Sequence, residues 1–200
     1  MKLEAVVLAA GSSRRFAGIK QLAMYQGQTL LQHTLSQYFA KTKLLKGIEQ
    51  LTVVLGANES VIRQLTLPGV VCFTAPNWQR GMGASLADFI KQVPQTVTHV
   101  LVGLADQVAL TTDDLLSLIH LCEQQPEAIV CAQYGDVQGV PAIFPRSFFK
   151  YLIELDNDKG ARALIQQHAA SVRTVNLPNA AIDIDTPEQL QRLQVEYCSP

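Results

Sequence analysis

The residues with the clearest chemical potential follow the first apolar segment of the chain, residues 3–10. The small residues Gly11-Ser12-Ser13 come next, and the cations Arg15 and Lys20 lie a few positions further on. Small side chains let a ligand approach the backbone, whose amides can hold a phosphate group. The loop is neither a Walker A nor a G-x-G-x-x-G sequence, so an ordinary turn with solvated basic residues is the alternative.

Acidic residues later in the chain occupy positions typical of metal ligands. Asp106 ends the apolar run 101–105, where a carboxylate can hold Mg²⁺ beside substrate phosphates. A turn or a helix cap is the alternative role for this residue. Asp183 and Asp185 would share one face of a strand, and one of them could be a second metal ligand. Asp185 could also cap the helix that begins at Thr186-Pro187, or do both.

One further segment could contact an anion. Gly81 and Gly83 stand at an expected helix start, where the backbone can come close to a ligand and the helix dipole favours negative charge. A flexible loop followed by a helix cap is the alternative. The segments 139–141 and 158–162 mean little alone, and a surface helix beginning at Gly160 is the simplest explanation of the second.

These candidates require a fold that brings several strand ends together. Apolar runs predict strands over residues 3–10, 50–56, 70–74, 99–104, 128–132, 140–144, 172–175 and 181–184. Helical spacing predicts helices over residues 29–43, 59–65, 82–93 and 160–168, and further helices from 112 and 185. This alternation favours an open, largely parallel α/β sheet with helices on both faces and a late antiparallel excursion around Gly135. In such sheets the site lies at the carboxyl ends of the strands.

Composition narrows the class of protein. The chain has 200 residues and is 48% hydrophobic, which fits one domain, residues 1–200, with a core that needs no disulfides. The net charge of −1 argues against a nucleic-acid or anionic-membrane partner, and no apolar run approaches the ~20 residues of a bilayer span. The four cysteines include no C-x-x-C pair, so we expect reduced thiols in a cytoplasmic protein.

Taken in order, these segments resemble the molybdenum-cofactor nucleotidyltransferases of the MobA-like NTP-transferase superfamily, and within it most the cytidylyltransferase branch. The similarity extends from Ala5 to about Leu193. It is carried by the following motifs: Leu8-Ala9-Ala10-Gly11-x-Ser13-x-Arg15 with Lys20-Gln21-Leu22, Asn77 to Leu86, Asp106-Gln107, Asp158-x-Gly160-Ala161-Arg162, and Asp183 to Glu188.

The resemblance implies a three-layer α/β/α Rossmann-like nucleotidyltransferase fold with a mostly parallel mixed sheet. It implies transfer of CMP from CTP to the phosphate of molybdopterin carrying molybdenum, with release of pyrophosphate, Mg²⁺ as cofactor and a molybdenum hydroxylase as a conceivable client. The catalytic residues implied are Lys20, Arg15 and Asp106, and the metal ligands are Asp106 and Asp185. The nucleotide would contact Leu8, Ala9, Ala10, Gly11, Ser12, Ser13, Arg15, Lys20, Gly81 and Met82. The acceptor would contact Ser85, Gly139, Val140, Pro141, Arg162 and Asp183.

The chain departs from the family pattern at several positions. Phe16-Ala17 replaces the usual Met-Gly, Val108 replaces a Pro after Asp-Gln, and Asn157 stands where Gly is common. Gly139-Val140-Pro141 replaces Gly-His-Pro on the acceptor side, so a sugar phosphate or polyol phosphate is an alternative acceptor. A non-catalytic molybdenum-cofactor carrier is a second alternative. A nicotinamide-dinucleotide dehydrogenase is disfavoured because the first loop lacks the glycine fingerprint.

Overall fold

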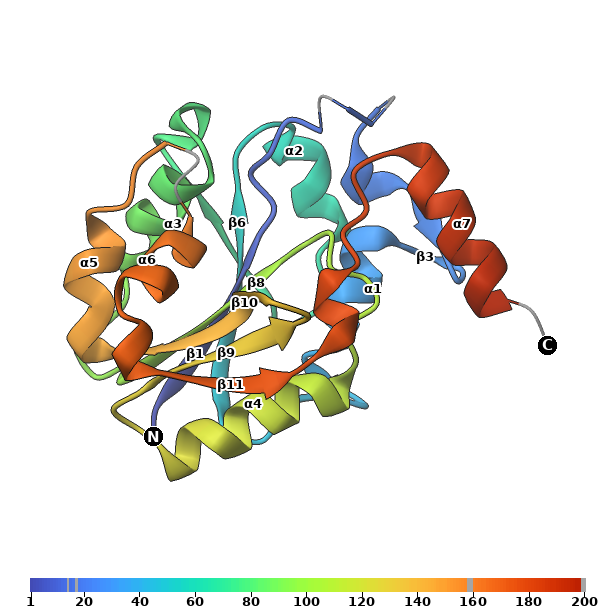
Figure 1. Ribbon diagram of the computed structural model, residues 1–200. Helices are drawn as coiled ribbons and strands as arrows, with labels where there is room; N and C mark the ends of the chain where they lie inside the picture. Colours follow the sequence, from blue (N-terminus) through green and yellow to red (C-terminus); the bar gives the residue numbers. More distant parts are fainter. Residues whose placement is uncertain (14, 17, 158–159, 199–200) are drawn as a thin grey trace.

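The computed structural model describes residues 1–13, 15–16, 18–157 and 160–198 (Figure 1). At its centre is a 7-stranded sheet with the strand order β11-β9-β10-β8-β1-β6-β7. Its strands are β1 (Leu3–Leu8), β6 (Ile48–Leu55), β7 (Val71–Thr74), β8 (His99–Leu104), β9 (Ile129–Tyr134), β10 (Val137–Pro145) and β11 (Val172–Asn176). The continuous apolar run of β1 reflects its central place, because every one of its residues is buried between neighbouring layers.

The sheet is mixed, as the sequence predicted, and β10 is its antiparallel strand. β10 pairs antiparallel with β8 and with β9, whereas the pairs β1–β6, β1–β8, β6–β7 and β9–β11 are parallel. The turn between β9 and β10 is Gly135-Asp136, and Gly135 has a φ of 58°. A glycine adopts this left-handed conformation without the steric cost that a Cβ atom brings.

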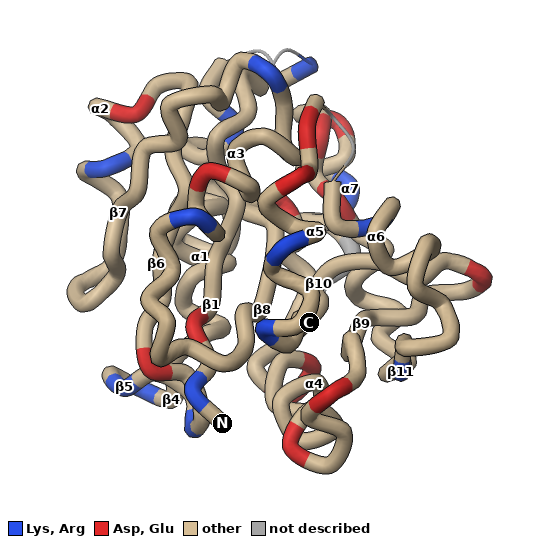
Figure 2. The backbone as a smooth tube through the Cα atoms, turned by 90° about the vertical axis from the view of Figure 1, so that its left-hand side faces the viewer, with Lys and Arg blue, Asp and Glu red and all other residues tan. Residues whose placement is uncertain are grey.

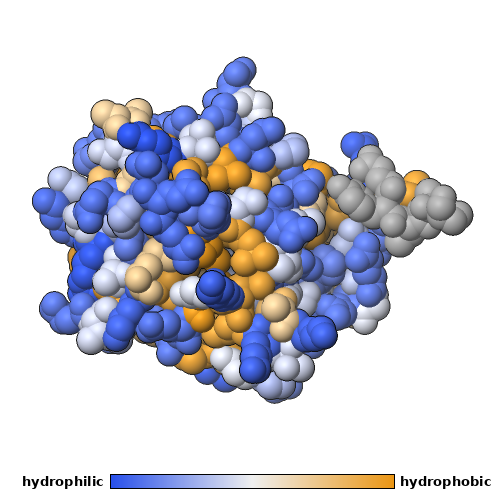
Figure 3. All heavy atoms as spheres, turned by 90° about the horizontal axis from the view of Figure 1, so that it is seen from below, coloured by the Kyte–Doolittle hydropathy of each residue, from blue (hydrophilic) through white to orange (hydrophobic). Residues whose placement is uncertain are grey.

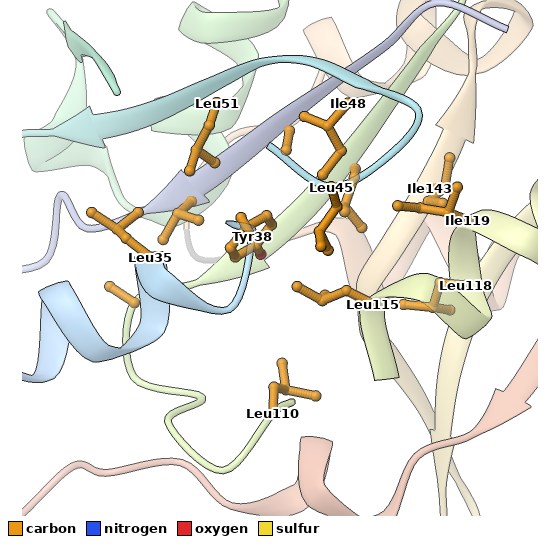
Figure 4. Close-up of a cluster of buried hydrophobic side chains, with 14 of the residues drawn as sticks. Leu35, Tyr38, Leu45, Ile48, Leu51, Leu110, Leu115, Leu118, Ile119 and Ile143 are labelled. Carbon is orange, nitrogen blue, oxygen red and sulfur yellow. The ribbon is translucent and has the colours of Figure 1, made fainter. Parts of the chain in front are cut away.

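Helices cover both faces of the sheet and complete a three-layer α/β/α fold (Figure 1). One face packs against α1 (Leu30–Ser36), α2 (Glu59–Ile62) and α4 (Thr112–Gln124), and Figure 4 shows part of that core, in which Tyr38 and Leu45 lie among leucines and isoleucines. The other face packs against α3 (Met82–Ile90), α5 (Phe149–Ile153) and α6 (Ala161–Gln167). The two faces therefore have separate apolar cores on either side of β1 and β8.

A third, smaller apolar cluster joins the segment that follows β1 to the last helix. Leu190 and Leu193 of α7 (Pro187–Cys198) pack with Tyr25, Leu30 and Ile184. Tyr25 belongs to the small hairpin of β2 (Met24–Tyr25) and β3 (Gln28–Thr29). Burial of these side chains, at ~1.5–3 kcal/mol each, holds the segment before α7 against the loop that follows β1.

The helix expected over residues 29–43 is much shorter in the structure. It begins as predicted, with the side chain of Thr29 accepting from the backbone N–H of Gln32 in a capping box. It ends at Ser36, because Tyr38 enters the core and the chain then forms the hairpin of β4 (Phe39–Ala40) and β5 (Lys43–Leu44). Tertiary burial therefore overrides a helical pattern that local propensity would extend.

The prediction of a strand over residues 181–184 is wrong. Pro178–Ala181 forms a 3-10 turn, and the chain then runs irregularly to Asp185. The side-chain amide of Gln107 donates to the carbonyl oxygen of Ala180 at 3.0 Å, and the N–H of Ile184 donates to that of Asp106 at 3.1 Å. These bonds satisfy the backbone that a ladder would otherwise pair. The pattern also missed α5, which is too short to show helical periodicity.

Gly103 in the middle of β8 supports a prediction about stability. A Cβ atom there would overlap the hydroxyl of the fully buried Tyr38, whereas the ring atom Cζ would stay at 3.6 Å. We expect Gly103→Ala to lower the free energy of unfolding by about 1–3 kcal/mol, and Gly103→Ala/Tyr38→Phe to recover most of that loss. Urea denaturation of the single and double variants measures this, and a double variant no more stable than Gly103→Ala would contradict it.

Basic and acidic residues are spread over many elements of the chain, as Figure 2 shows. Seen from below, mostly hydrophilic side chains surround an area where apolar atoms reach the surface (Figure 3). Among the described residues, no helix combines the length and the apolar character needed to cross a membrane.

Candidate active site

The loops that follow β1 and β8 lie next to each other at the carboxyl end of the sheet. The N–H of Ala105 donates to the carbonyl oxygen of Leu8 at 3.1 Å, and the N–H of Ala9 donates to that of Val54 at 2.9 Å. A cavity of about 680 Å³ opens over these strand ends. It is lined by Leu8, Ala9, Ala10, Gly11, Ser12, Ser13, Arg15, Lys20, Gln21, Trp78, Gln79, Arg80, Gly81, Met82, Ser85, Leu104, Ala105, Asp106 and Asp185.

The structure thus brings together every residue that the sequence assigned to a nucleotide or to a metal, and Ser85 with them. Gly139, Val140, Pro141, Arg162 and Asp183 are not among the residues that line this cavity. Arg14, Ala17, Asp158 and Lys159 lie outside the described residues, so the structure does not address these positions of the motifs.

A cluster of two cations and two carboxylates forms the charged centre of the cavity. Lys20 Nζ lies 2.8 Å from Asp106 Oδ2 and 3.2 Å from Asp185 Oδ1. Arg15 Nη2 lies 2.8 Å from Asp185 Oδ2. The Lys20 side chain is 14% exposed and that of Arg15 is 73% exposed, so water and salt screen the Arg15 pair far more strongly.

Lys20 is held in place by the loop that precedes it. It begins the 3-10 turn Lys20–Leu22, and its N–H donates to Ser13 Oγ at 3.3 Å. The Ser13 hydroxyl donates to Gln21 Oε1, and Gln21 Nε2 donates to the carbonyl oxygen of Ala9, each at 3.2 Å. Gln21 is buried, so it connects the end of β1 to the turn that carries Lys20. The sequence placed Gln21 in a motif without assigning it this function.

Asp185 is available to the cluster because other residues begin the last helix. Thr186 Oγ1 accepts from the N–H of Gln189, and Gln189 Oε1 accepts from the N–H groups of Asp185 and Thr186. This reciprocal arrangement satisfies the first turn of the helix without the Asp185 carboxylate. The alternative of Asp185 as the cap is therefore wrong, and its two oxygens contact Lys20 and Arg15.

A second wall of the cavity comes from the 3-10 turn Trp78–Arg80, which the sequence left without a function. The buried carboxylate of Asp88 on α3 accepts from the N–H of Asn77 at 2.9 Å and from its side-chain amide at 3.1 Å. Trp78 packs over Gly56, where a Cβ atom would lie 2.6 Å from Trp78 Cγ. The single tryptophan of the chain was the available signal for this wall.

The turn Trp78–Arg80 also contacts the segment that precedes α6. Arg80 Nη2 lies 2.5 Å from Asp156 Oδ2, and this guanidinium lowers the pKa of Asp156. The N–H of Gly83 donates to the carbonyl oxygen of Asn157 at 2.9 Å. Both partners lie at the surface, so this pair orients Arg80 more than it stabilises the fold.

Asp183, one of the residues expected to contact an acceptor, lies close enough to the charged cluster to feel its charges. Asp183 has an exposed surface, yet partial removal from water, followed by the charges of Asp106 and Asp185, raises its pKa to about 6. Tyr134 covers Gly139, where a Cβ atom would lie 2.6 Å from the tyrosine hydroxyl. Burial and the charge of Asp183 raise the pKa of Tyr134, and the charge of Arg162 lowers it. These effects indicate a polar region next to the cavity.

The cluster has the donors that a magnesium-sized cation needs. Asp106 Oδ1 is buried and has no hydrogen-bond partner, an arrangement that costs free energy unless another group completes it. Among the described residues, no group of three or more His, Cys, Asp and Glu side chains is arranged to hold a metal ion. Two carboxylates with ligand phosphates and water are, however, a usual Mg²⁺ environment. Asp106 and Asp185 therefore fit a cation that a phosphate ligand helps to hold.

The fold and the cavity together define a nucleotidyltransferase: an α/β sheet whose first loop, cations and paired carboxylates suit a nucleoside triphosphate. The chain belongs to the MobA-like NTP transferase domain family, whose model matches residues 5–172.

The chain is similar over nearly its whole length to two relatives and to a solved structure. The chain is 30% identical to nicotine blue oxidoreductase of Paenarthrobacter nicotinovorans over 94% of each protein. It is 27% identical to molybdenum cofactor guanylyltransferase of Shewanella frigidimarina, over 98% of this chain and 97% of that protein. Rv0371c of Mycobacterium tuberculosis, solved in complex with manganese, superposes with a TM-score of 0.78 at 28% identity, covering 98% of this chain and 99% of that one.

Proposed function

We propose that this protein transfers CMP from CTP to the phosphate of the molybdenum cofactor and releases pyrophosphate. The observation that carries the proposal is the cluster of Lys20, Asp106 and Asp185 in the cavity above β1 and β8. The acceptor is suggested by the relative named molybdenum cofactor guanylyltransferase. The choice of CTP rests on the resemblance of residues 77–86 to the cytidylyltransferase branch.

In the proposed reaction, an oxygen of the acceptor phosphate forms a bond to the α-phosphorus of CTP. The bond from that phosphorus to the oxygen bridging the β-phosphate breaks, and its electron pair leaves with pyrophosphate. The attacking oxygen is already ionised at neutral pH, so no general base is required. Catalysis then depends on positioning and on stabilising negative charge.

The residues of the cluster have distinct parts in this scheme. Asp106 and Asp185 would hold Mg²⁺, which when bound supplies positive charge to the phosphate oxygens; the manganese complex of a relative supports a divalent cation. Lys20 faces the α-phosphate and the transition state. Arg15 binds the β- and γ-phosphates, for which a planar fork of donors is suited.

The remaining contacts would come from the walls of the cavity. Backbone amides between Ala10 and Ser13 line the triphosphate and base. Gly81, Met82 and Ser85 lie between nucleotide and acceptor, and the polar region around Asp183, Arg162 and residues 139–141 contacts the acceptor. A molybdenum hydroxylase that receives the product is the proposed client, and the cytoplasm the proposed compartment.

A sugar phosphate or polyol phosphate is the second candidate acceptor, and Val140 is the observation that favours it. Val140 packs against the apolar core around α3 and α5, and its carbonyl oxygen accepts from Gln107 Nε2 at 3.0 Å. The position therefore lacks the imidazole that is usual on the acceptor side in the family.

Pyrophosphate release by the purified protein with Mg²⁺ tests the proposal. CTP, GTP and ATP are each supplied with and without molybdenum cofactor, and then with a panel of sugar and polyol phosphates. Release with CTP only in the presence of molybdenum cofactor is the expected result. Release with another acceptor alone would move the function to that acceptor, and tight cofactor binding with no turnover would favour a carrier.

One relative is named nicotine blue oxidoreductase, so the same preparation is assayed for reduction of nicotine blue by a reduced nicotinamide dinucleotide. Dye reduction without pyrophosphate release for any nucleotide would contradict a transferase.

Asp88 supports a prediction about the wall that carries Trp78. Asp88→Ala removes the acceptor of the Asn77 bonds, so we expect it to weaken nucleotide binding about tenfold and to destabilise the fold by ~1–3 kcal/mol. Lys91→Ala is the matched control, because Lys91 Nζ lies 3.6 Å from the same carboxylate and is half exposed. Isothermal titration calorimetry with CTP measures the affinity, and equal binding by Asp88→Ala and wild type would refute the positioning.

A further inference from the structure

The carboxylates proposed to hold a metal are already occupied by cations of the protein. Lys20 Nζ contacts Asp106 Oδ2 at 2.8 Å and Asp185 Oδ1 at 3.2 Å, and Arg15 Nη2 contacts Asp185 Oδ2 at 2.8 Å. Asp106 Oδ1 is the carboxylate oxygen of this cluster that is buried without a hydrogen-bond partner. A cation that approaches both carboxylates therefore meets one ammonium group placed between them.

The position of Lys20 makes this competition strong. Its side chain is 14% exposed, against 23% for Asp106 and 31% for Asp185. Water screens charges less effectively in such a cleft than at the surface, so both the attraction of Lys20 to the carboxylates and its repulsion of a second cation are larger there. The backbone N–H of Lys20 donates to Ser13 Oγ, which in turn donates to Gln21 Oε1, and these bonds keep the backbone of Lys20 beside the cluster.

A nucleoside triphosphate would change this balance. Its phosphate oxygens offer Lys20 an alternative anionic partner within the same cavity, which Lys20 and both aspartates line. An ammonium drawn to the phosphates leaves oxygens of Asp106 and Asp185 free for the metal. The metal in turn neutralises phosphate charge, so each ligand favours binding of the other, and linkage makes that effect reciprocal.

We propose that Lys20 excludes a divalent cation from the Asp106–Asp185 pair until the phosphates of a nucleotide draw its ammonium group away, so that metal and nucleotide bind interdependently. The inference rests on the proposed function for the identity of the nucleotide. Its core claim, that Lys20 competes with a metal for these carboxylates, concerns the protein without nucleotide.

Mn²⁺ binding to the full chain tests the proposal, measured by isothermal titration calorimetry and by the loss of the free Mn²⁺ electron paramagnetic resonance signal. Without nucleotide, we expect wild type to bind weakly and Lys20→Met to bind at least about tenfold more tightly, within the range of site-to-site coupling. Lys91→Met is the matched control. Because Lys91 Nζ contacts Asp88 at 3.6 Å and Lys91 does not line the cavity, we expect that variant to change Mn²⁺ affinity less than about threefold.

The second arm adds a CTP analogue that cannot be cleaved between its α- and β-phosphates. We expect it to tighten Mn²⁺ binding by wild type more than by Lys20→Met, since the variant has lost the competitor. Asp106→Asn combined with Lys20→Met locates the metal: loss of the tight Mn²⁺ binding supports the proposal, and its retention overturns it. Circular dichroism and the unfolding midpoint establish that each variant is folded, and Lys20→Gln is a second neutral variant.

Mn²⁺ affinity of folded Lys20→Met and Lys20→Gln equal to that of wild type overturns the proposal. Failure of the proposed function has a different signature. In that case wild type binds none of the nucleotides, while the gain of Mn²⁺ affinity in Lys20→Met is still observed. If wild type binds a nucleotide but Lys20→Met shows no gain of Mn²⁺ affinity, the competition between Lys20 and the metal is refuted and the proposed function is not.

Discussion

Asp106→Asn is expected to lower kcat for pyrophosphate release about a thousandfold, the order of effect seen when a group that stabilises transition-state charge is lost. The substitution removes the negative charge that contacts Lys20 at 2.8 Å, and it replaces one carboxylate oxygen with an amide NH₂ group that cannot coordinate a cation. The fold should persist, because the backbone carbonyl of Asp106, which accepts from Ile184, is unchanged.

Asp113→Asn is a suitable control for this experiment. Asp113 is an exposed residue of α4 outside the cavity, so the same chemical change there should leave kcat within twofold, about the scatter expected of surface substitutions. Urea denaturation should give Asp106→Asn a midpoint close to that of wild type. Pyrophosphate release near the wild-type rate in folded Asp106→Asn would refute the assignment of Asp106 to the metal.

The sequence identified much of the charged cluster because of where its residues fall along the chain. β1 and β8 are continuous apolar runs, as expected for strands buried on both faces, and β8 has the predicted limits. Residues that directly follow parallel strands meet at one edge of a sheet. That rule places the loop after β1 next to Asp106 without knowledge of any long-range contact.

The rest of the site depends on tertiary contacts that no local pattern encodes. Asp185 lies on an irregular segment instead of a strand, and Lys20 reaches it across 165 positions of sequence. The direction of Trp78 depends on bonds from Asn77 to the buried Asp88, eleven positions later. In the same way, the sequence could not show that Thr186 and Gln189 would begin the last helix and leave the Asp185 carboxylate to the cluster.

The position of the residues assigned to the acceptor also depends on tertiary contacts that the sequence pattern does not encode. Resemblance assigned Gly139, Val140, Pro141 and Arg162 to the acceptor, and the structure keeps them outside the lining of the main cavity. Gly139 is covered by Tyr134, a residue that no motif indicated. A register shift between Gly139 and Ala142 in the β9–β10 pair moves side chains locally in a way that alternation of apolar residues does not reveal.

Lys20→Ala is expected to lower kcat about a hundredfold and to raise the KM for the nucleotide by a smaller factor. Lys20 is nearly enclosed, and in the proposed reaction its ammonium faces the α-phosphate where charge develops, so its loss should cost more in the transition state than in the bound substrate. Arg15→Ala should show the reverse pattern, because an exposed guanidinium on the β- and γ-phosphates contributes mainly to binding.

Steady-state kinetics with varied nucleotide at saturating Mg²⁺ and acceptor separate the two cations. Saturating metal matters, because the loss of Lys20 is expected to change metal affinity as well, and a subsaturating concentration would mix the two effects. A rise of KM alone in Lys20→Ala would mean that Lys20 only binds the nucleotide. If Lys20→Ala and Arg15→Ala change kcat and KM equally, the difference in exposure between Lys20 (14%) and Arg15 (73%) has no consequence for catalysis.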